Sequence, residues 1–254
     1  MTAYKTSLLA TAAAIALAGP VAAAGSCDTV TFSDVGWTDI TSTTAATSIV
    51  LNALGYKTET KILSVPVTYA SMAEGNIDVF LGNWMPTMEG DIATYRAAGT
   101  VDTVRTNLEG AKYTLATNAA GVAAGITDFD DRDKAVVFLG WEPHPMNANF
   151  DMTYLPGGDD YFGPDLGGAI VATNTRAGYV AECANTGKLL QNLSFSLAME
   201  NEIMAAILDD GVDPEDAARA WLAGNTDTWT PWLAGVTTKD GGDAVAAVTA
   251  ALAN

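Results

Sequence analysis

The chain has 254 residues, of which 49% are hydrophobic, and a formal net charge of −18 at pH 7. A balance this acidic argues strongly against nucleic acid or an anionic membrane surface as a partner, because both would repel it. The length is enough for two small lobes or one larger domain with a sizeable buried core. The carboxylates also exert a mild long-range attraction for cations, although surface carboxylates usually serve solubility.

The first 24 residues have the three parts of a secretory signal peptide. Lys5 is their single basic residue, an apolar run covers residues 8–18, and three alanines end the segment at Ala24. The run is too short for a transmembrane helix, and no later stretch approaches the roughly 20 apolar residues needed to span a bilayer. We therefore expect cleavage near Ala24 and a soluble, exported protein.

Strands and helices are expected to alternate from Thr29 to Trp84, a pattern that predicts an α/β fold with a largely parallel sheet. A Gly-, Ala- and Asp-rich stretch at residues 118–133 reads as a loop or a weak helix. The C-terminal third reads as mostly helical. The predicted strands cover residues 30–32, 58–63, 77–81, 101–104, 112–117, 137–139 and 169–173. The predicted helices cover residues 41–54, 67–74, 89–98, 188–196, 200–208, 214–223 and 242–252.

Two short stretches echo each other: VFLGNWMP at residues 79–86 and VFLGWEP at residues 137–143. Each reads as a buried strand that ends in glycine and then presents a tryptophan, Trp84 or Trp141. Ligands in open α/β sheets lie beyond the carboxyl ends of strands, so the two rings suggest one pocket approached from two sides. A tryptophan taken alone is more often part of a core, and Trp221, Trp229 and Trp232 are assigned to packing of the C-terminal helices.

The order of the elements indicates two lobes joined by two crossings that act as hinges. Residues 25–115 and 175–254 are expected to form a discontinuous first lobe, and residues 116–174 a shorter second lobe. The two cysteines, Cys27 and Cys183, are most simply one disulfide in an exported chain, and that bond would join both parts of the first lobe. Lipidation of Cys27 is the alternative, although Ala-Gly-Ser before it is a poor lipobox.

We expect neither a metal nor a cofactor, because two distant thiols and the lone His144 make no convincing ligand set. His144 lies between two prolines and is interpreted as a structural residue of a turn. A secreted hydrolase that uses Glu142 and His144 remains a rival hypothesis. It lacks a nucleophile in a recognised elbow and a partner carboxylate at a diagnostic spacing.

Four motifs together resemble the substrate-binding proteins of ABC importers for quaternary amines, and most of all the choline-binding branch of the glycine betaine/proline betaine/choline group. They are SDVGWTD at residues 33–39, VFLGNWMP at 79–86, AKYTL at 111–115 and FLGWEPHPM at 138–146. The resemblance implies a bilobal periplasmic binding protein of the type II kind that closes on its ligand. It also implies a membrane permease as partner, a periplasmic location and a monomer.

By this resemblance, Trp37, Trp84, Tyr113 and Trp141 form an aromatic box around a trimethylammonium group. A quaternary ammonium has no N–H to donate, so ring faces and shape must hold it, at roughly 0.5–2 kcal/mol for each ring. Asp39 would face the hydroxyl end of the ligand or add a counter-charge, which favours choline over the zwitterionic betaines. As an alternative, Asp39 caps the helix expected to begin near residue 41.

The chain departs from the family in the second lobe. Family members carry several dozen more residues between the segment that resembles residues 126–129 and the strand that leads to Trp141, where this chain has only residues 130–135. The missing stretch normally supplies part of the second lobe and an asparagine that contacts the ligand. A pared-down receptor, a degenerate member that no longer binds ligand, and a deletion in the gene all fit this sequence.

Overall fold

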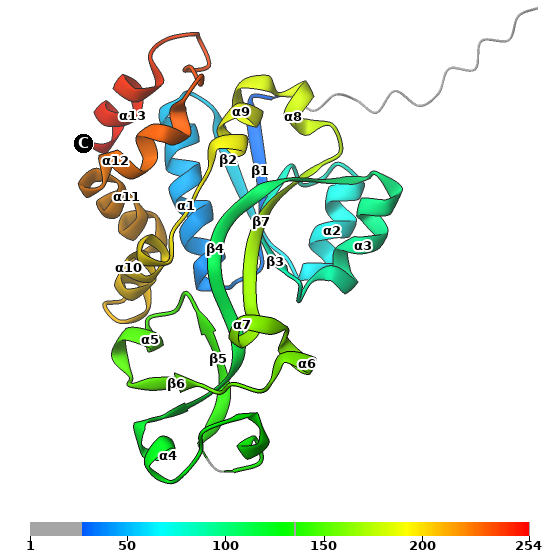
Figure 1. Cartoon of the computed structure of the whole chain (residues 1–254). Coiled ribbons are helices and arrows are strands. Elements are labelled where there is room, and N and C mark those ends of the chain that lie inside the picture. Colours follow the sequence, from blue (N-terminus) through cyan, green and yellow to red (C-terminus); the bar gives the residue numbers. More distant parts are fainter. Residues whose placement is uncertain (1–26, 135, 254) are drawn as a thin grey trace, which may run out of the picture.

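The structure is a computed structural model that describes residues 27–134 and 136–253, so the expected signal peptide lies outside it. The described residues form two lobes joined by two long strands, β4 and β7 (Figure 1). We define the first lobe as residues 27–111 and 169–253, and the second lobe as residues 112–168. The expected bilobal α/β architecture with a small second lobe is confirmed. No helix in the described ranges is both long enough and apolar enough to cross a membrane.

One mixed sheet runs through both lobes, with the order β2-β1-β3-β7-β4-β5 and with β6 also paired to β4. Only β1 is parallel to its neighbours, β2 and β3, among the described pairings, and the other pairs are antiparallel. The prediction of a largely parallel sheet is therefore wrong beyond these three strands. The chain crosses between the lobes on strands that run in opposite directions, without a crossover helix between them. The strands are β1 (Thr29–Asp34), β2 (Lys57–Ile62), β3 (Val79–Met85), β4 (Val101–Asn118), β5 (Val137–Glu142), β6 (Met152–Tyr154) and β7 (Gly168–Arg176).

Helices cover both faces of the sheet in the first lobe, with α2 and α3 on one side and α1, α10 and α11 on the other (Figure 1). Side chains of Ser196, Asp213 and Asp243 cap the N-termini of α10, α11 and α13, as polar residues before helices usually do. The helices of the first lobe are α1 (Thr38–Ala53), α2 (Val65–Ala73), α3 (Glu89–Ala98), α8 (Tyr179–Glu182), α9 (Ala184–Asn192), α10 (Leu197–Leu208), α11 (Pro214–Gly224), α12 (Thr226–Trp229), a 3-10 turn (Thr230–Leu233) and α13 (Ala244–Leu252).

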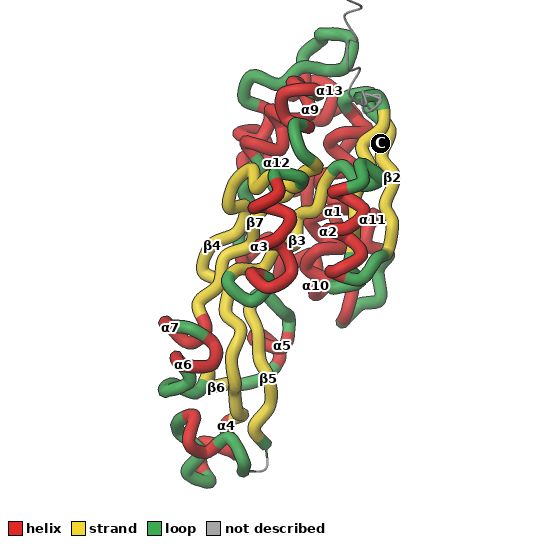
Figure 2. The backbone as a smooth tube through the Cα atoms, turned by 90° about the vertical axis from the view of Figure 1, so that its right-hand side faces the viewer, coloured by secondary structure: helices red, strands yellow, loops and turns green. Residues whose placement is uncertain are grey.

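The second lobe is a narrow extension of β4 and β5 with short helices around it (Figure 2). These are α4 (Ala119–Ala123), a 3-10 turn (Phe129–Asp131), α5 (Met146–Asn149), α6 (Asp159–Phe162) and α7 (Pro164–Gly167). Residues 118–133, predicted to be a loop or a weak helix, thus contain two short helical turns. The strands expected at 101–104 and 112–117 form a single strand, β4, whose pairing with β7 shifts register three times between Thr103 and Ala111.

The main hydrophobic core lies in the first lobe, and Trp229 and Trp232 are fully buried in it, as predicted. Trp221 is partly buried and packs against the same core. Buried apolar side chains of the second lobe form a separate, much smaller group: Ala116, Ile126, Phe129 and Leu155.

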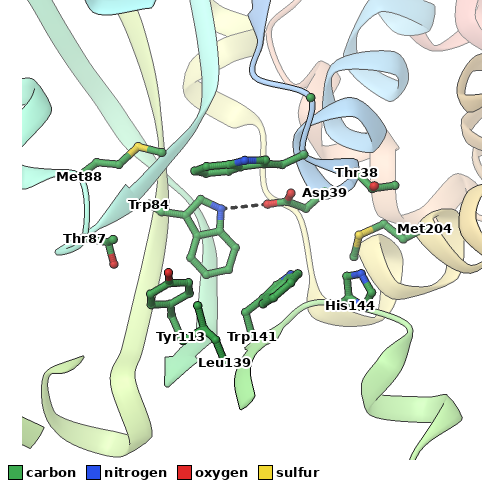
Figure 3. A pocket seen from close by; sticks show the side chains of 12 residues that line it. Thr38, Asp39, Trp84, Thr87, Met88, Tyr113, Leu139, Trp141, His144 and Met204 are labelled. Carbon is green, nitrogen blue, oxygen red and sulfur yellow. Dashed lines mark hydrogen bonds between the residues drawn. The ribbon is translucent and has the colours of Figure 1, made fainter. Parts of the chain in front are cut away.

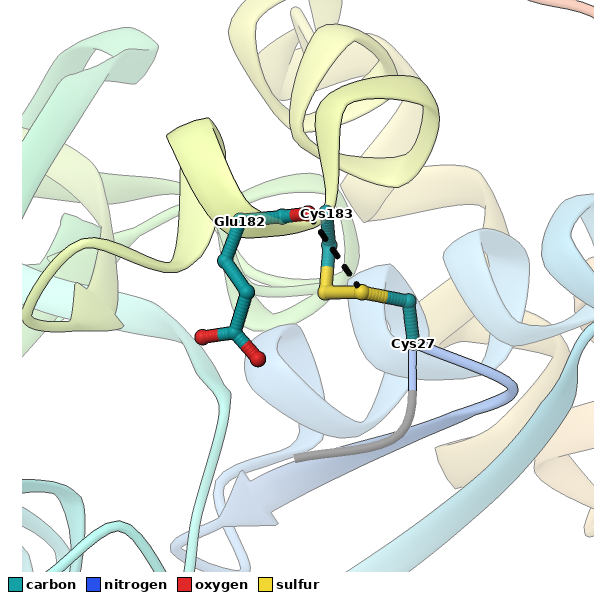
Figure 4. Close-up of side chains that lie close together, drawn as sticks. All are labelled: Cys27, Glu182 and Cys183. Atoms are coloured by element: carbon teal, nitrogen blue, oxygen red, sulfur yellow. Dashed lines mark hydrogen bonds between the residues drawn. A yellow bond between two sulfur atoms is a disulfide. The ribbon is translucent and has the colours of Figure 1, made fainter. Parts of the chain in front are cut away.

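The expected disulfide between Cys27 and Cys183 is present, with an S–S distance of 1.99 Å (Figure 4). It ties Cys27, two residues before β1, to the junction of α8 and α9, 156 residues later. Both anchor points belong to the first lobe. Glu182 lies close to the two sulfurs, but sulfurs joined in a disulfide offer no thiolate to a metal ion.

Candidate functional site

A cavity of about 410 Å³ lies between the two lobes (Figure 3). All five residues predicted to bind ligand line it. The first lobe contributes Gly36, Trp37, Thr38, Asp39, Trp84, Thr87, Met88 and Met204, and the second lobe contributes Tyr113, Leu139, Trp141 and His144. Most of these side chains are apolar or aromatic, which is typical of a pocket for a small organic ligand.

A sharp turn after β1 presents Trp37 to the cavity. The backbone of Gly36 has a φ of +78°, a conformation that favours glycine, and its N–H donates to the carboxylate of Asp34 over 2.7 Å. The hydroxyl of Thr41 donates to the second oxygen of Asp34. Trp37 itself is the N-cap residue of α1, and 44% of its surface is exposed. Its side chain therefore lines the cavity and remains partly open to solvent.

Trp84 and Asp39 are joined by a hydrogen bond in the wall of the first lobe. The indole Nε1 of Trp84 donates to Oδ2 of Asp39 over 2.9 Å, and both side chains are buried (Figure 3). Strand β3 comes this close to α1 because Gly82 has no side chain. A Cβ atom there would lie 2.6 Å from Cδ1 of Ile40. The glycine of the motif thus permits close packing inside the strand.

Two sequence-based expectations about these residues are wrong. Neither Gly82 nor Gly140 ends its strand, because β3 continues to Met85 and β5 to Glu142. Asp39 does not cap α1, because that helix begins at Thr38, with Trp37 as its N-cap residue. The carboxylate of Asp39 instead lies in the first helical turn and accepts the hydrogen bond of the indole.

Tyr113 and Trp141 are directly opposite each other on β4 and β5. Side chains at such a pair project from the same face of a sheet, so the second lobe presents the two rings together. The next pair along, Lys112 and Glu142, forms an ion pair over 2.5 Å on the opposite face. The lysine charge is thereby neutralised, and Glu142 does not line the cavity.

His144 lies in the turn after β5, as predicted, and it also lines the cavity, which was not predicted. Its Nδ1 accepts the backbone N–H of Met146 over 3.1 Å, and its ring packs edge-on against Trp141 with centroids 5.1 Å apart. Partial burial lowers its pKa below the ordinary value, against a smaller opposing effect of Asp209. His144 is therefore neutral at pH 7 and adds no positive charge to the cavity.

The charge of the cavity is governed by carboxyl groups. Burial raises the pKa of Asp39 to about 6, although the Trp84 hydrogen bond acts in the opposite direction. A second buried carboxyl group is that of Glu200 on α10, the helix that packs against α1, and it is 2% exposed. Burial, together with the charge of Asp39, raises the pKa of Glu200 well above its ordinary value.

Sequence reasoning missed several wall residues, because no local signal marks them. Met204 reaches the cavity from α10, more than 100 residues after Trp84 in the chain, and Thr87 and Met88 follow the β3 motif. Leu139 and Thr38 are neighbours of predicted residues and could have been inferred from the motifs that contain them.

Comparison with known proteins agrees with this geometry. The sequence pattern of the OpuAC family, described as the substrate-binding domain of ABC-type glycine betaine transport systems, matches residues 28–134 and 118–224. The chain belongs to this family. The two matches overlap at residues 118–134, which lie between β4 and β5 of the second lobe apart from Asn118 at the end of β4.

Solved structures give the same result. A structure described as an ABC-transporter choline-binding protein in complex with choline is 55% identical, with a TM-score of 0.85, and the match covers 89% of this chain and 99% of that one. A structure of such a protein in an unliganded semi-closed conformation is 54% identical, with a TM-score of 0.80, over 91% of this chain and 100% of that one.

A more distant relative is the glycine betaine/carnitine transport binding protein GbuC of Listeria monocytogenes. It is 28% identical over 136 residues, which are 53% of this chain and 44% of GbuC.

Proposed function

We propose that this OpuAC-family protein is an extracytoplasmic receptor that captures choline, or a related quaternary ammonium, and delivers it to an ABC permease. The observation that carries the proposal is the grouping of Trp37, Trp84, Tyr113 and Trp141 around one cavity that contains a carboxylate, Asp39. Aromatic faces attract a cation that cannot donate hydrogen bonds. The similarity to proteins described as choline-binding supports the same ligand.

Closure of the two lobes would complete the box. Trp37, Trp84 and Asp39 belong to the first lobe, whereas Tyr113 and Trp141 belong to the second. The irregular pairing of β4 with β7 supports a hinge there, because register shifts interrupt the regular ladder where the strands pass from one lobe to the other. Neither lobe alone offers four rings.

We further propose that the protein binds its ligand without converting it, as a periplasmic monomer with its signal peptide removed. The hydrolase hypothesis needs Glu142 and His144 to act together. Glu142 is instead paired with Lys112 outside the cavity wall, and Nδ1 of His144 is occupied by a backbone N–H. A cavity between closing lobes suits capture and release better than chemistry.

Titration calorimetry with choline and with its neutral carbon analogue 3,3-dimethyl-1-butanol tests the proposal. The two ligands have nearly the same shape, so the difference between them measures recognition of the charge. We expect saturable one-to-one binding of choline and binding of the analogue weaker by about 100-fold, since three or four rings each contribute roughly 0.5–2 kcal/mol.

Absence of heat and of a tryptophan fluorescence change up to millimolar choline, in protein shown to be folded by circular dichroism, would contradict the proposal. That result would leave a degenerate family member. Disappearance of choline from the NMR spectrum during incubation would instead indicate an enzyme.

A further inference from the structure

Asp39 is backed by a second buried carboxyl group, that of Glu200, which none of the predicted binding motifs contains. Glu200 lies in the first half of α10, and Met204, one turn later on the same helix, lines the cavity. Helix α10 packs against α1, the helix that carries Asp39. Two acidic residues, 5% and 2% exposed, are therefore buried in the packed pair of helices behind the cavity wall, which Asp39 lines and Glu200 does not.

No ion pair among the described residues includes Asp39 or Glu200. Within that set, the charge of Asp34 raises the pKa of Asp39, and the charge of Asp39 raises the pKa of Glu200. His144 faces the cavity from the second lobe, and because burial lowers its pKa below the ordinary value it is mostly neutral at pH 7. The charged side chains on α10 itself and on the elements packed against α1 and α10 are Asp34 on β1, Lys57, Glu59 and Lys61 on β2, Asp102, Arg105, Glu109 and Lys112 on β4, Glu202 on α10, and Glu215, Asp216 and Arg219 on α11.

Two buried carboxyl groups without a cation cannot both ionise at low cost. Burial raises the pKa of Asp39 to about 6, and the charge of Asp39 then disfavours ionisation of Glu200, whose pKa is raised further by its own burial. Groups coupled in this way lose their two protons in two separate steps, and the pKa of each step depends on both groups. Asp39 therefore titrates first, near pH 6, Glu200 loses its proton only after it, and at pH 5 the pair is mostly uncharged.

We propose that Asp39 and Glu200 form a proton-linked cation site, in which capture of a quaternary ammonium releases a proton from the pair to solvent, with Glu200 as a positioning residue that sets the charge of Asp39. This inference rests on the proposed function. The balance is simple: a carboxylic acid becomes a carboxylate, the proton leaves to the buffer, and the fixed charge of the ligand replaces it.

The proposal gives a defined pH dependence. Below pH 6 Asp39 is protonated, so a cation must displace that proton, and choline affinity at pH 5 should be about tenfold lower than at pH 7.5. Above pH 6 Asp39 is ionised and Glu200 holds the remaining proton. A cation beside Asp39 offsets the repulsion between the two carboxyl groups, so any proton released at a pH where Asp39 is already ionised comes from Glu200.

Calorimetry of the full chain in buffers of different ionisation enthalpy measures the protons released for each choline bound. We expect about half a proton at pH 6, from Asp39, and further release from Glu200 at higher pH, where Asp39 is already ionised. In Glu200→Gln, release should persist at pH 6 and fall to near zero at pH 8. The matched variant Glu202→Gln removes an exposed carboxylate two residues away and should behave like the unmodified protein.

Glycine betaine supplies a control with the unmodified protein, so the conclusion does not depend on folding of a variant. Its own carboxylate cancels the net charge, and we expect proton release at least several-fold smaller than with choline. Choline binding without proton release at any pH would overturn the inference and leave the proposed function intact. Release that is the same in Glu200→Gln would overturn the role of Glu200, and absence of choline binding would overturn both proposals.

Discussion

The two lobes both line the cavity, but they differ in how firmly their aromatic side chains are packed. In the first lobe Trp84 is 5% exposed, hydrogen-bonded to Asp39 and continuous with a large core that a disulfide reinforces. In the second lobe Tyr113 and Trp141 are only partly buried, on two strands that extend from the shared sheet. A small lobe buries a low fraction of its surface and is marginal alone. The comparison indicates that the first lobe holds its part of the binding site rigidly, whereas the second lobe holds its part in a less stable structure.

Alanine substitutions of Trp84 and Trp141 should produce the largest contrast. Trp84→Ala should lower the free energy of unfolding by about 3–5 kcal/mol, because a buried indole is lost from the core. It should also weaken choline binding by roughly 100-fold or more, since a ring and the hydrogen bond to Asp39 disappear together. Trp141→Ala should weaken binding about tenfold and change stability by about 1 kcal/mol or less.

Denaturant unfolding and calorimetry on both variants check this contrast. Trp221→Ala is the control, because Trp221 is partly buried in the first lobe and does not line the cavity. Its choline affinity should equal that of the unmodified protein. Equal losses of stability in Trp84→Ala and Trp141→Ala would contradict the conclusion that the first lobe is packed more firmly than the second.

Removal of the disulfide should affect the first lobe alone. The double variant Cys27→Ser, Cys183→Ser should be less stable by about 2–5 kcal/mol, because the unfolded chain regains the freedom of a long loop. Choline affinity at 25 °C should remain within about twofold, since both cysteines lie outside the cavity wall. Thermal unfolding with and without choline measures both quantities, and a large loss of affinity in folded protein would show that the bond supports the site.

The smallest expected effect concerns the aromatic cluster that stabilises the second lobe. Phe129 stacks on Tyr161 with ring centroids 4.8 Å apart, and it also contacts Phe162, which packs against Tyr113. Phe129→Ala should loosen this lobe, weaken choline binding by about three- to tenfold, and leave the main unfolding transition nearly unchanged.

Hydrogen exchange measured by mass spectrometry would locate that loosening. We expect faster exchange in β5 and β6, with β1 to β3 unchanged. Val122→Ala replaces an exposed residue of α4 and should be silent. A large fall of the main transition in Phe129→Ala would mean that the two lobes unfold as one unit.

The sequence was informative wherever function required aromatic rings in motifs, and less so wherever the fold depended on long-range pairing. Trp37, Trp84, Tyr113 and Trp141 were predicted and all line the cavity. The antiparallel pairing of β4 with β7 was not predicted, because local alternation of strands and helices cannot report the direction of a distant partner. Glu200 was missed for the same reason, since its neighbour Asp39 precedes it by more than 150 residues.

The register of β4 against β5 has a consequence for how this protein can change over evolutionary time. Tyr113 and Trp141 face each other near the base of the hairpin, whereas the residues between β4 and β5 form its tip. A slip of one residue would turn a ring away from the cavity, but residues lost beyond the paired segment leave the pair in place. Loss of residues of the tip outside the Phe129 cluster therefore leaves both rings facing the cavity, so a lineage could shorten its second lobe and keep Tyr113 and Trp141 in place.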